Sequence, residues 1–163
     1  MIATLRPGRE RAAWQLRLLR AMGSRASGPV LLGRQVEIHD PAKLTLGARV
    51  AIGPDSRIVC WAPIEIGDDF LGAGGLHLDS GSHSPESLEP LDRPIRIGHR
   101  VWCGTRVTIC AGVEIGDDVV LGAGAVVVKS IPAGVVAAGV PAKPLRPLNR
   151  PVDGGRLWSI WDR

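Results

Sequence analysis

The chain has 163 residues, of which 45% are hydrophobic and 22% charged, and its formal net charge is +4. This length has room for one hydrophobic core, and no stretch approaches the ~20 apolar residues of a membrane span. The N-terminus has no signal-peptide core, and the three cysteines lack CxxC spacing. We therefore expect a cytoplasmic protein with reduced thiols, one of which, Cys103, belongs to the core.

The first 29 residues are rich in arginine and form a segment of their own. Residues 9–22 have the spacing of an amphipathic helix, with Trp14, Leu18 and Met22 on one stripe. We expect this helix to pack over the open end of the following domain, where it would protect edge backbone groups. The alternative is peripheral contact with an anionic membrane. We expect no binding to nucleic acid, because no motif for it accompanies the charge.

Apolar residues recur every six positions from residue 30 onward, with a two-residue slip near Ala62 and Pro63. The period is clearest from Ile97 to Val126, which read IGHRVW, CGTRVT, ICAGVE, IGDDVV and LGAGAV. The opening residue and the residue four places later share a parity, so both point to one side of a strand. A single amphipathic sheet would also alternate, but it would not place glycine after the opening residue of most units. The pattern predicts an all-β parallel β-helix of about five coils over residues 30–132.

The six-residue register breaks between Leu78 and Ile97. Residues 84–94 are mostly polar and predict an extended loop, and the stretch Asp79-Ser-Gly-Ser-His83 stands just before it. If the preceding frame continues, the His83 side chain points outward beside this loop. We expect the other histidines, His39, His77 and His99, to be solvated surface residues.

Four motifs carry a resemblance to a known family. They are Pro94-Ile-Arg-Ile-Gly98, Val101-Trp-Cys-Gly104, Leu121-Gly-Ala-Gly-Ala125 and Ala138-Gly-Val-Pro-Ala-Lys143. Residues 30–146 resemble the hexapeptide-repeat acyltransferases, in particular the sugar O-acetyltransferase branch with the galactoside and maltose acetyltransferases and polysaccharide-modifying enzymes. This leaves residues 147–163, with Trp158 and Trp161, as a C-terminal tail.

The resemblance implies a left-handed helix, which the period alone cannot reveal. It also implies a homotrimer whose active sites lie between subunits, with a CoA thioester along the groove and an extended loop reaching across. The implied reaction is transfer of an acetyl group from acetyl-CoA to a hydroxyl of a saccharide acceptor, without a metal. A sugar hydroxyl is a poor nucleophile at neutral pH, so a general base must take its proton as it attacks.

The family positions assign roles to individual residues. His83 matches the catalytic base, Trp102 would wall the groove, and the Thr105 backbone N–H would stabilise the oxyanion. The backbone at Ala123 and Gly124 would meet the pantetheine amides. Three cations match positions near the CoA phosphates and adenine, namely Lys129, Lys143 and Arg146.

The acceptor side departs from the galactoside enzymes, in which an Asp orients the sugar. The corresponding stretch here is Ile58-Val-Cys-Trp-Ala-Pro63, without an acid. Trp61 could stack on a sugar face instead, and Glu86 in the loop could accept hydroxyl hydrogen bonds. This difference favours a polysaccharide precursor or specialised metabolite over a free disaccharide.

Two alternatives remain open at this point, and a third is disfavoured by the spacing of the histidines. The same scaffold could carry N-acetyl transfer to an amino sugar or antibiotic, or it could be a β-helix without catalytic activity. A metal-dependent hydratase would need three histidines converging on zinc, and the spacing of the four histidines gives no such set.

Overall fold

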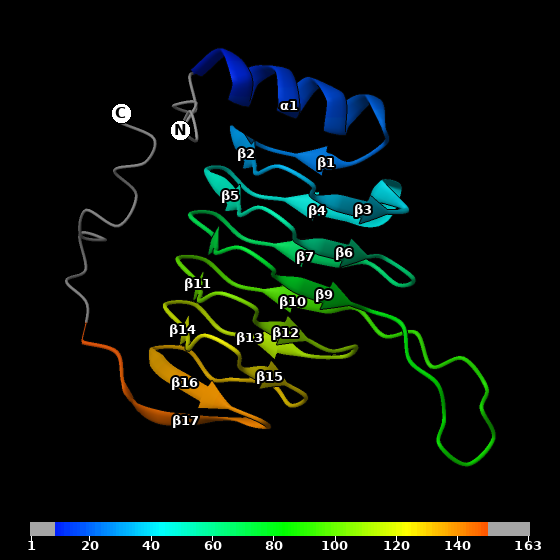
Figure 1. Cartoon of the computed structure of the whole chain (residues 1–163), viewed down its shortest axis with the longest axis vertical. Helices are drawn as coiled ribbons and strands as arrows, with labels where there is room; N and C mark the ends of the chain where they lie inside the picture. Colours follow the sequence, from blue (N-terminus) through cyan, green and yellow to red (C-terminus); the bar gives the residue numbers. More distant parts are fainter. Residues whose placement is uncertain (1–8, 150–163) are drawn as a thin grey trace, which may run out of the picture.

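Short parallel strands stacked in three sheets form a triangular prism (Figure 1). The computed structural model describes residues 9–149. In spatial order, sheet A contains β1 (Arg25–Ala26), β4 (Leu44–Leu46), β7 (Ile64–Ile66), β10 (Ile95–Ile97) and β13 (Glu114–Ile115). Sheet C contains β15 (Val126–Val127), β12 (Thr108–Ile109), β9 (His77–Asp79), β6 (Arg57–Val59) and β3 (Glu37–His39). Sheet B contains β17 (Ala142–Pro147), β16 (Val135–Gly139), β14 (Val120–Leu121), β11 (Trp102–Cys103), β8 (Leu71–Gly72), β5 (Val50–Ile52) and β2 (Val30–Leu32).

The chain visits sheets A, B and C in turn, so each group of three consecutive strands forms one coil. Strands β1 to β15 make five complete coils, and the bridge between Ile115 and Ile131 begins a sixth, incomplete one. The strands β16 and β17 then pair antiparallel and close this end of the prism. The predicted parallel β-helix of about five coils is confirmed.

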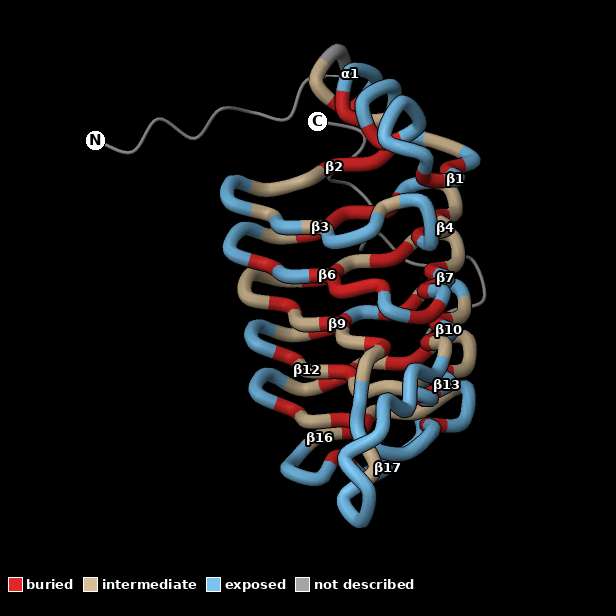
Figure 2. Tube along the Cα trace, turned by 90° about the vertical axis from the view of Figure 1, so that its right-hand side faces the viewer, coloured by how far each residue is buried: buried red, intermediate tan, exposed pale blue. Residues whose placement is uncertain are grey.

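The interior of the prism is filled by the two sets of side chains that share a parity. Val101, Cys103 and Val107 are fully buried, as are the equivalent residues of the neighbouring coils. Figure 2 shows this alternation of buried and exposed segments along every coil. In β8, Gly72 occupies an inward position, and Phe70 and Leu76 fill the space that its missing side chain leaves. The period therefore predicts side-chain direction, and Cys103 belongs to the core as expected.

Helix α1 (Arg9–Ala21) lies across the first coil, and it packs against β1 and β2. Its packing face consists of Ala12, Gln15 and Leu19, all of which are buried. The expected cover over the open end is confirmed, but the Trp14, Leu18 and Met22 stripe points to solvent rather than to the prism. The reason is that the top of the first coil presents unpaired backbone groups, and the Gln15 amide satisfies two of them. No helix within residues 9–149 is both long and apolar enough to cross a membrane.

Strand β2 lies at the edge of sheet B, and the Gln15 side chain forms hydrogen bonds there in place of a neighbouring strand. Its Nε2 donates to the Leu32 carbonyl at 3.0 Å, and its Oε1 accepts from the Leu32 N–H at 3.0 Å. Gln15→Ala is expected to lower the free energy of unfolding by about 2 kcal/mol, because the Leu32 N–H loses its partner and the Leu32 carbonyl keeps only the hydrogen bond from Arg11 at 3.2 Å. Urea unfolding at fixed protein concentration measures this, with the exposed Arg17→Ala as the control on the same helix. A change equal to that of the control would contradict the capping role.

A short 3₁₀ turn (Pro41–Lys43) follows β3 and widens the first coil where sheet C meets sheet A. The larger interruption is the segment 80–94 between β9 and β10, which stands away from the body of the prism (Figure 1). The expected loop is present at the expected place. The proposed tail with Trp158 and Trp161 lies outside the described residues.

Candidate functional site

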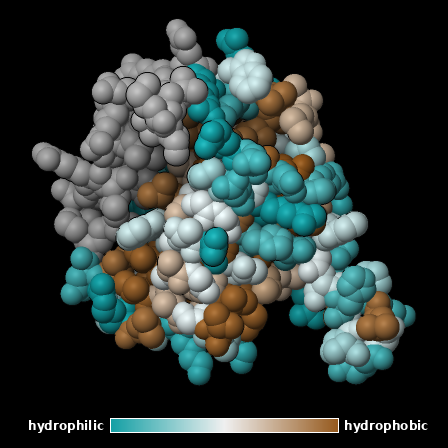
Figure 3. All heavy atoms as spheres, viewed as in Figure 1, coloured by the Kyte–Doolittle hydropathy of each residue, from teal (hydrophilic) through white to brown (hydrophobic). Residues whose placement is uncertain are grey.

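The segment 80–94 is an ordered hairpin rather than an open loop. His83 and Pro90 form an antiparallel bridge, and the Leu91 N–H donates to the Ser82 carbonyl at 2.8 Å. At its base the Arg93 N–H donates to the Ser80 carbonyl at 2.9 Å. Figure 3 shows the hairpin projecting from the prism with a mostly hydrophilic surface, and Leu88 within it is 75% exposed. All hydrogen bonds that residues 84–89 form lie within the hairpin itself, so its outer part is free to contact another molecule.

His83 lies at the start of this hairpin and is exposed. No described residue forms a hydrogen bond or ion pair with its imidazole, so both ring nitrogens are accessible to a bound molecule. The hairpin leaves the prism at the C–A corner, by which we mean the column of turns that connect each sheet C strand to the next sheet A strand. Trp61 lies in the preceding turn of this column, and Lys129 lies in the turn two coils further on.

Thr105, Ala123 and Gly124 lie on a different edge, the B–C corner, formed by the turns from sheet B to sheet C. The Gly124 N–H donates to the Thr105 carbonyl at 2.8 Å, which stacks these two turns directly. The N–H groups of Thr105 and Ala123 donate to no described residue. These two donors therefore remain available to a ligand that lies along this corner.

Trp102 and two of the three predicted cations are placed near that second group. Trp102 is on the outer surface of sheet B and is 37% exposed, three residues before Thr105. Lys143 pairs with Ala138, whose Cβ lies beside Gly122. Arg146 follows on the same strand opposite Val136, and its guanidinium donates to the Pro147 carbonyl at 3.2 Å.

The predicted site residues thus form two groups within one chain. His83, Trp61, Glu86 and Lys129 belong to the C–A corner or its hairpin, whereas Thr105, Ala123 and Gly124 belong to the B–C corner. The two corners are separated by the width of sheet C. One chain alone therefore does not bring the predicted base next to the predicted oxyanion donor.

Of the other three histidines, only His77 is less solvated than we expected. His77 faces outward from sheet C, but its Nε2 is buried and has no partner among the described residues. The Nδ1 of His99 accepts a hydrogen bond from the Asp68 N–H at 3.0 Å. The side chains of His39 and His99 are 53% and 50% exposed, so both are surface residues as expected. Coil stacking explains the partial burial of His77, because each outward side chain has neighbours above and below.

The cysteines do not form a nucleophilic centre. Burial raises the pKa of Cys60 to about 11, and it raises the pKa of Cys103 further still. The pKa of Cys110 is also raised, mainly by burial and then by the Asp79 carboxylate. A thiol becomes reactive when its pKa is lowered, so these three lack the activation that a covalent acyl intermediate would need.

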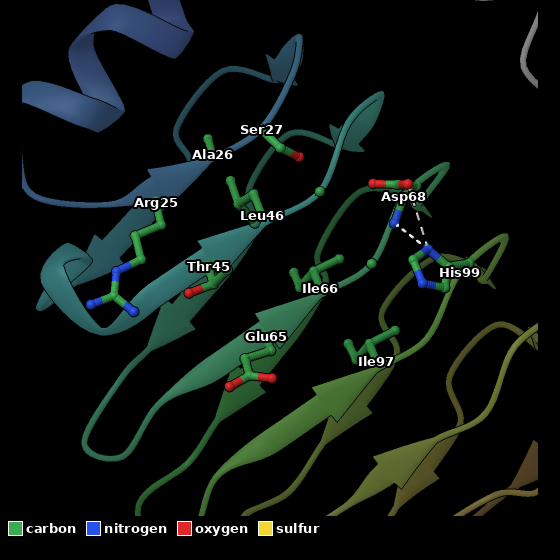
Figure 4. A pocket seen from close by; sticks show the side chains of 12 residues that line it. Arg25, Ala26, Ser27, Thr45, Leu46, Glu65, Ile66, Asp68, Ile97 and His99 are labelled. Atoms are coloured by element: carbon green, nitrogen blue, oxygen red, sulfur yellow. Dashed lines mark hydrogen bonds and ion pairs between the residues drawn. The ribbon is translucent and has the colours of Figure 1, made fainter.

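A shallow groove runs along the outer face of sheet A (Figure 4). Its lining includes Arg25, Thr45 and Glu65, with Asp68 and His99 at one end. None of the predicted site residues lines it. Within residues 9–149, no group of three or more His, Cys, Asp or Glu side chains is arranged to hold a metal ion.

Sequence reasoning missed two residues that organise the C–A corner. Ser80 is fully buried, and its hydroxyl bonds to the backbone of the preceding coil. Lys43 donates from Nζ to the Trp61 carbonyl at 2.8 Å and pairs with Asp40 at 2.9 Å. The position of Ser80 two residues after the inward Leu78 was a possible signal for its burial. Nothing in the local sequence indicates the role of Lys43.

Stacked hexapeptide coils, a cap and a projecting hairpin define a class of protein, the hexapeptide-repeat β-helix transferases. The family model "Bacterial transferase hexapeptide (six repeats)" matches residues 94–129. The putative colanic acid biosynthesis acetyltransferase WcaF of Escherichia coli K12 is 37% identical over 135 residues, covering 82% of this chain and 74% of that protein.

Solved structures agree with the sequence comparison. Galactoside acetyltransferase in complex with coenzyme A matches with a TM-score of 0.77 at 30% identity, covering 87% of this chain and 74% of that chain. A hexapeptide-repeat acetyltransferase of Vibrio cholerae, complexed with acetyl coenzyme A, matches with a TM-score of 0.71 at 26% identity, covering 85% and 78%. The chain belongs to the hexapeptide-repeat acyltransferases, and the expected left-handed β-helix is confirmed.

Proposed function

We propose that the protein transfers an acetyl group from acetyl-CoA to a hydroxyl of a saccharide acceptor. The observation that carries this proposal is the division of the site into two corners, one with an exposed histidine and one with unpaired backbone donors. Acyl transfer needs both a base for the attacking hydroxyl and N–H groups for the oxyanion. The similarity to WcaF and to a galactoside acetyltransferase supports the donor and the acceptor class.

In this mechanism His83 acts as the general base. Its neutral imidazole takes the hydroxyl proton as the oxygen attacks the acetyl carbon, and the Thr105 N–H stabilises the oxyanion that forms. When the C–S bond breaks, the imidazolium returns the proton to the CoA thiolate. No covalent enzyme intermediate is required, which agrees with the raised pKa values of the thiols.

The active unit is a homotrimer in which the C–A corner of one subunit faces the B–C corner of the next. Such an arrangement would bring His83 of one chain to Thr105 of another, which one chain alone cannot do. The hairpin 80–94 would then reach across the interface, and the exposed Leu88 would lose its contact with water. The closed three-fold assembly would have three equivalent sites.

Acetyl-CoA would lie along the B–C corner beside the Trp102 ring. The unpaired N–H of Ala123 would donate to a pantetheine carbonyl, and Gly124 has φ +71° with nothing within 4 Å of its Cβ position, which leaves the backbone open to the ligand. Lys143 and Arg146 would neutralise the CoA phosphates from the same subunit. Lys129, on the opposite corner, would reach the cofactor from the neighbouring subunit.

On the acceptor side, Trp61 and Glu86 are the two candidates. Glu86 is exposed, and its Oε2 accepts a hydrogen bond from the Ser84 hydroxyl at 3.0 Å, so it can also accept one from a sugar. Trp61 is the better placed of the two because it lies in the C–A corner itself. The acceptor, in this view, is a polysaccharide precursor or another sugar-containing molecule in the cytoplasm.

Thiol release tests the proposed function. The full chain with acetyl-CoA is expected to release CoA thiol when nucleotide sugars, lipid-linked sugars or aminoglycosides are supplied, and the product should gain one acetyl group by mass spectrometry. An alkali-labile product indicates an ester, and an alkali-stable one would replace O-transfer with N-transfer. Sedimentation of the same sample should give three times the chain mass of 17.3 kDa. A chain that neither binds CoA nor releases thiol with any acceptor would overturn the proposal in favour of a non-catalytic β-helix.

A further inference from the structure

Trp61 is a large apolar side chain that is exposed yet held in a fixed position. It is 61% exposed, while its neighbours Cys60 and Ala62 are buried at 1% and 8%. The sequence therefore places a tryptophan at an outward position between two residues that are anchored in the core. An exposed indole ring offers a large contact area and loses little conformational freedom when a ligand covers it.

The indole lies directly on the backbone of the next coil, at Gly81. A Cβ at this glycine would come within 2.9 Å of both Cγ and Nε1 of Trp61, and closer still to Cδ1. The residue must therefore be glycine for the ring to occupy this place, although the φ of Gly81 would permit other residues. His83 follows two residues later, at most about 7 Å along the chain. The ring and the proposed base thus border the same small area.

Hydrogen bonds hold the turn that carries Trp61 on two sides. The fully buried Ser80 hydroxyl donates toward the carbonyls of Ala62 at 2.8 Å and Val59 at 3.1 Å, and it accepts from the Ala62 N–H at 2.9 Å. On the opposite side, Lys43 Nζ donates to the Trp61 carbonyl at 2.8 Å. Such support fixes a side chain well enough to orient a ligand.

The Trp61 ring also has an unused polar group. Its Nε1–H donates to no described residue, so it can donate to a hydroxyl of a molecule that lies on the ring. A sugar ring combines a face of C–H groups with hydroxyls at its rim, and it matches both properties of the indole. A carboxylate at this place would recognise hydroxyls alone.

We propose that Trp61 is a specificity-determining residue on which the acceptor sugar stacks, and that Gly81 and Ser80 position it next to His83. The proposal rests on the proposed function, because it deepens the same site. It specifies the acceptor as a saccharide whose uncharged C–H face covers the indole while one hydroxyl reaches His83. The stacked face cannot carry a charged substituent, since burial of that charge against an apolar ring would be costly.

Three variants of the full chain test separately the contributions of the Trp61 ring, its Nε1–H and its contact with Gly81. With the nucleotide sugar or lipid-linked sugar that gives the fastest thiol release as acceptor, Trp61→Ala is expected to raise the acceptor KM about tenfold, the loss of one aromatic contact. Trp61→Phe keeps a ring and loses the N–H, so a rise of about threefold is expected. Gly81→Ala leaves the tryptophan in the sequence but displaces it, and it should raise the acceptor KM as Trp61→Ala does.

The controls distinguish stacking from general damage. Trp14→Ala removes an equally exposed tryptophan on α1 and should leave the acceptor KM unchanged. The KM for acetyl-CoA and the melting temperature should stay at the wild-type values in the Trp61 variants. An acceptor KM within twofold of wild type in Trp61→Ala, with normal turnover, would overturn the stacking role and leave the transferase intact. Absence of thiol release by the wild type with every acceptor supplied, together with absence of CoA binding, would instead remove the proposed function.

Discussion

The variant His83→Ala is expected to lower kcat by at least about 100-fold, because general-base catalysis by a positioned imidazole contributes roughly this factor. His83 is exposed at the start of the hairpin 80–94 and makes no side-chain bond to a described residue, so its removal should not disturb the fold. The oligomeric state and the affinity for CoA should be unchanged. Thiol release measured with saturating acetyl-CoA and acceptor gives kcat directly.

A matched histidine controls for the loss of an imidazole as such. His99→Ala removes an outward-facing histidine on the turn between sheets A and B, at the opposite edge of sheet A from the hairpin. Its turnover should remain within twofold of wild type. If His83→Ala retained wild-type turnover, another group would have to act as the general base. The interpretation of the C–A corner as the part of the site that supplies the base would then be wrong.

The two-corner arrangement also shows what the sequence could predict and what it could not. The six-residue period predicts which way each side chain points, because direction depends only on local parity along a short strand. It therefore placed Cys103 inside and His83 outside. It also located the hairpin through the failure of the period between Leu78 and Ile97. The resemblance to a family of trimers supplied the expectation that sites lie between subunits.

Contacts between coils were beyond local reasoning, because their partners are about 20 residues apart. The apolar stripe of α1 was identified correctly as a stripe, but the helix packs on another face. The Gln15 amide determines which face packs, because it forms hydrogen bonds with the backbone at the edge of β2. A pattern of hydrophobic residues does not indicate such a bond. The packing of the Trp61 ring on Gly81 is another contact of this type, and neither residue alone predicts it.

The largest stability effect is expected where coil stacking leaves no space for a side chain. At Gly53 a Cβ would lie 2.5 Å from the Gly74 nitrogen and 2.6 Å from the Ala73 carbonyl carbon, both of which are backbone atoms of the next coil. The same coil contact holds the hydrogen bond from the Gly53 N–H to the Gly72 carbonyl at 2.8 Å. Backbone cannot rotate away as a side chain can, so the substitution must separate the coils.

Gly53→Ala is therefore expected to lower the free energy of unfolding by about 3 kcal/mol, the upper range for overpacking. The control is Gly74→Ala on the neighbouring coil, where the Cβ would meet Pro54 at 3.3 Å or more. This second variant should change stability by less than about 1 kcal/mol, because the reduced freedom of the unfolded chain offsets the mild contact. Urea unfolding at one protein concentration compares them under the same conditions of assembly. If Gly53→Ala lowered the free energy of unfolding no more than Gly74→Ala does, the coils would be able to separate without cost. The stacking of turns could then not be what fixes the spacing of the site residues along each corner.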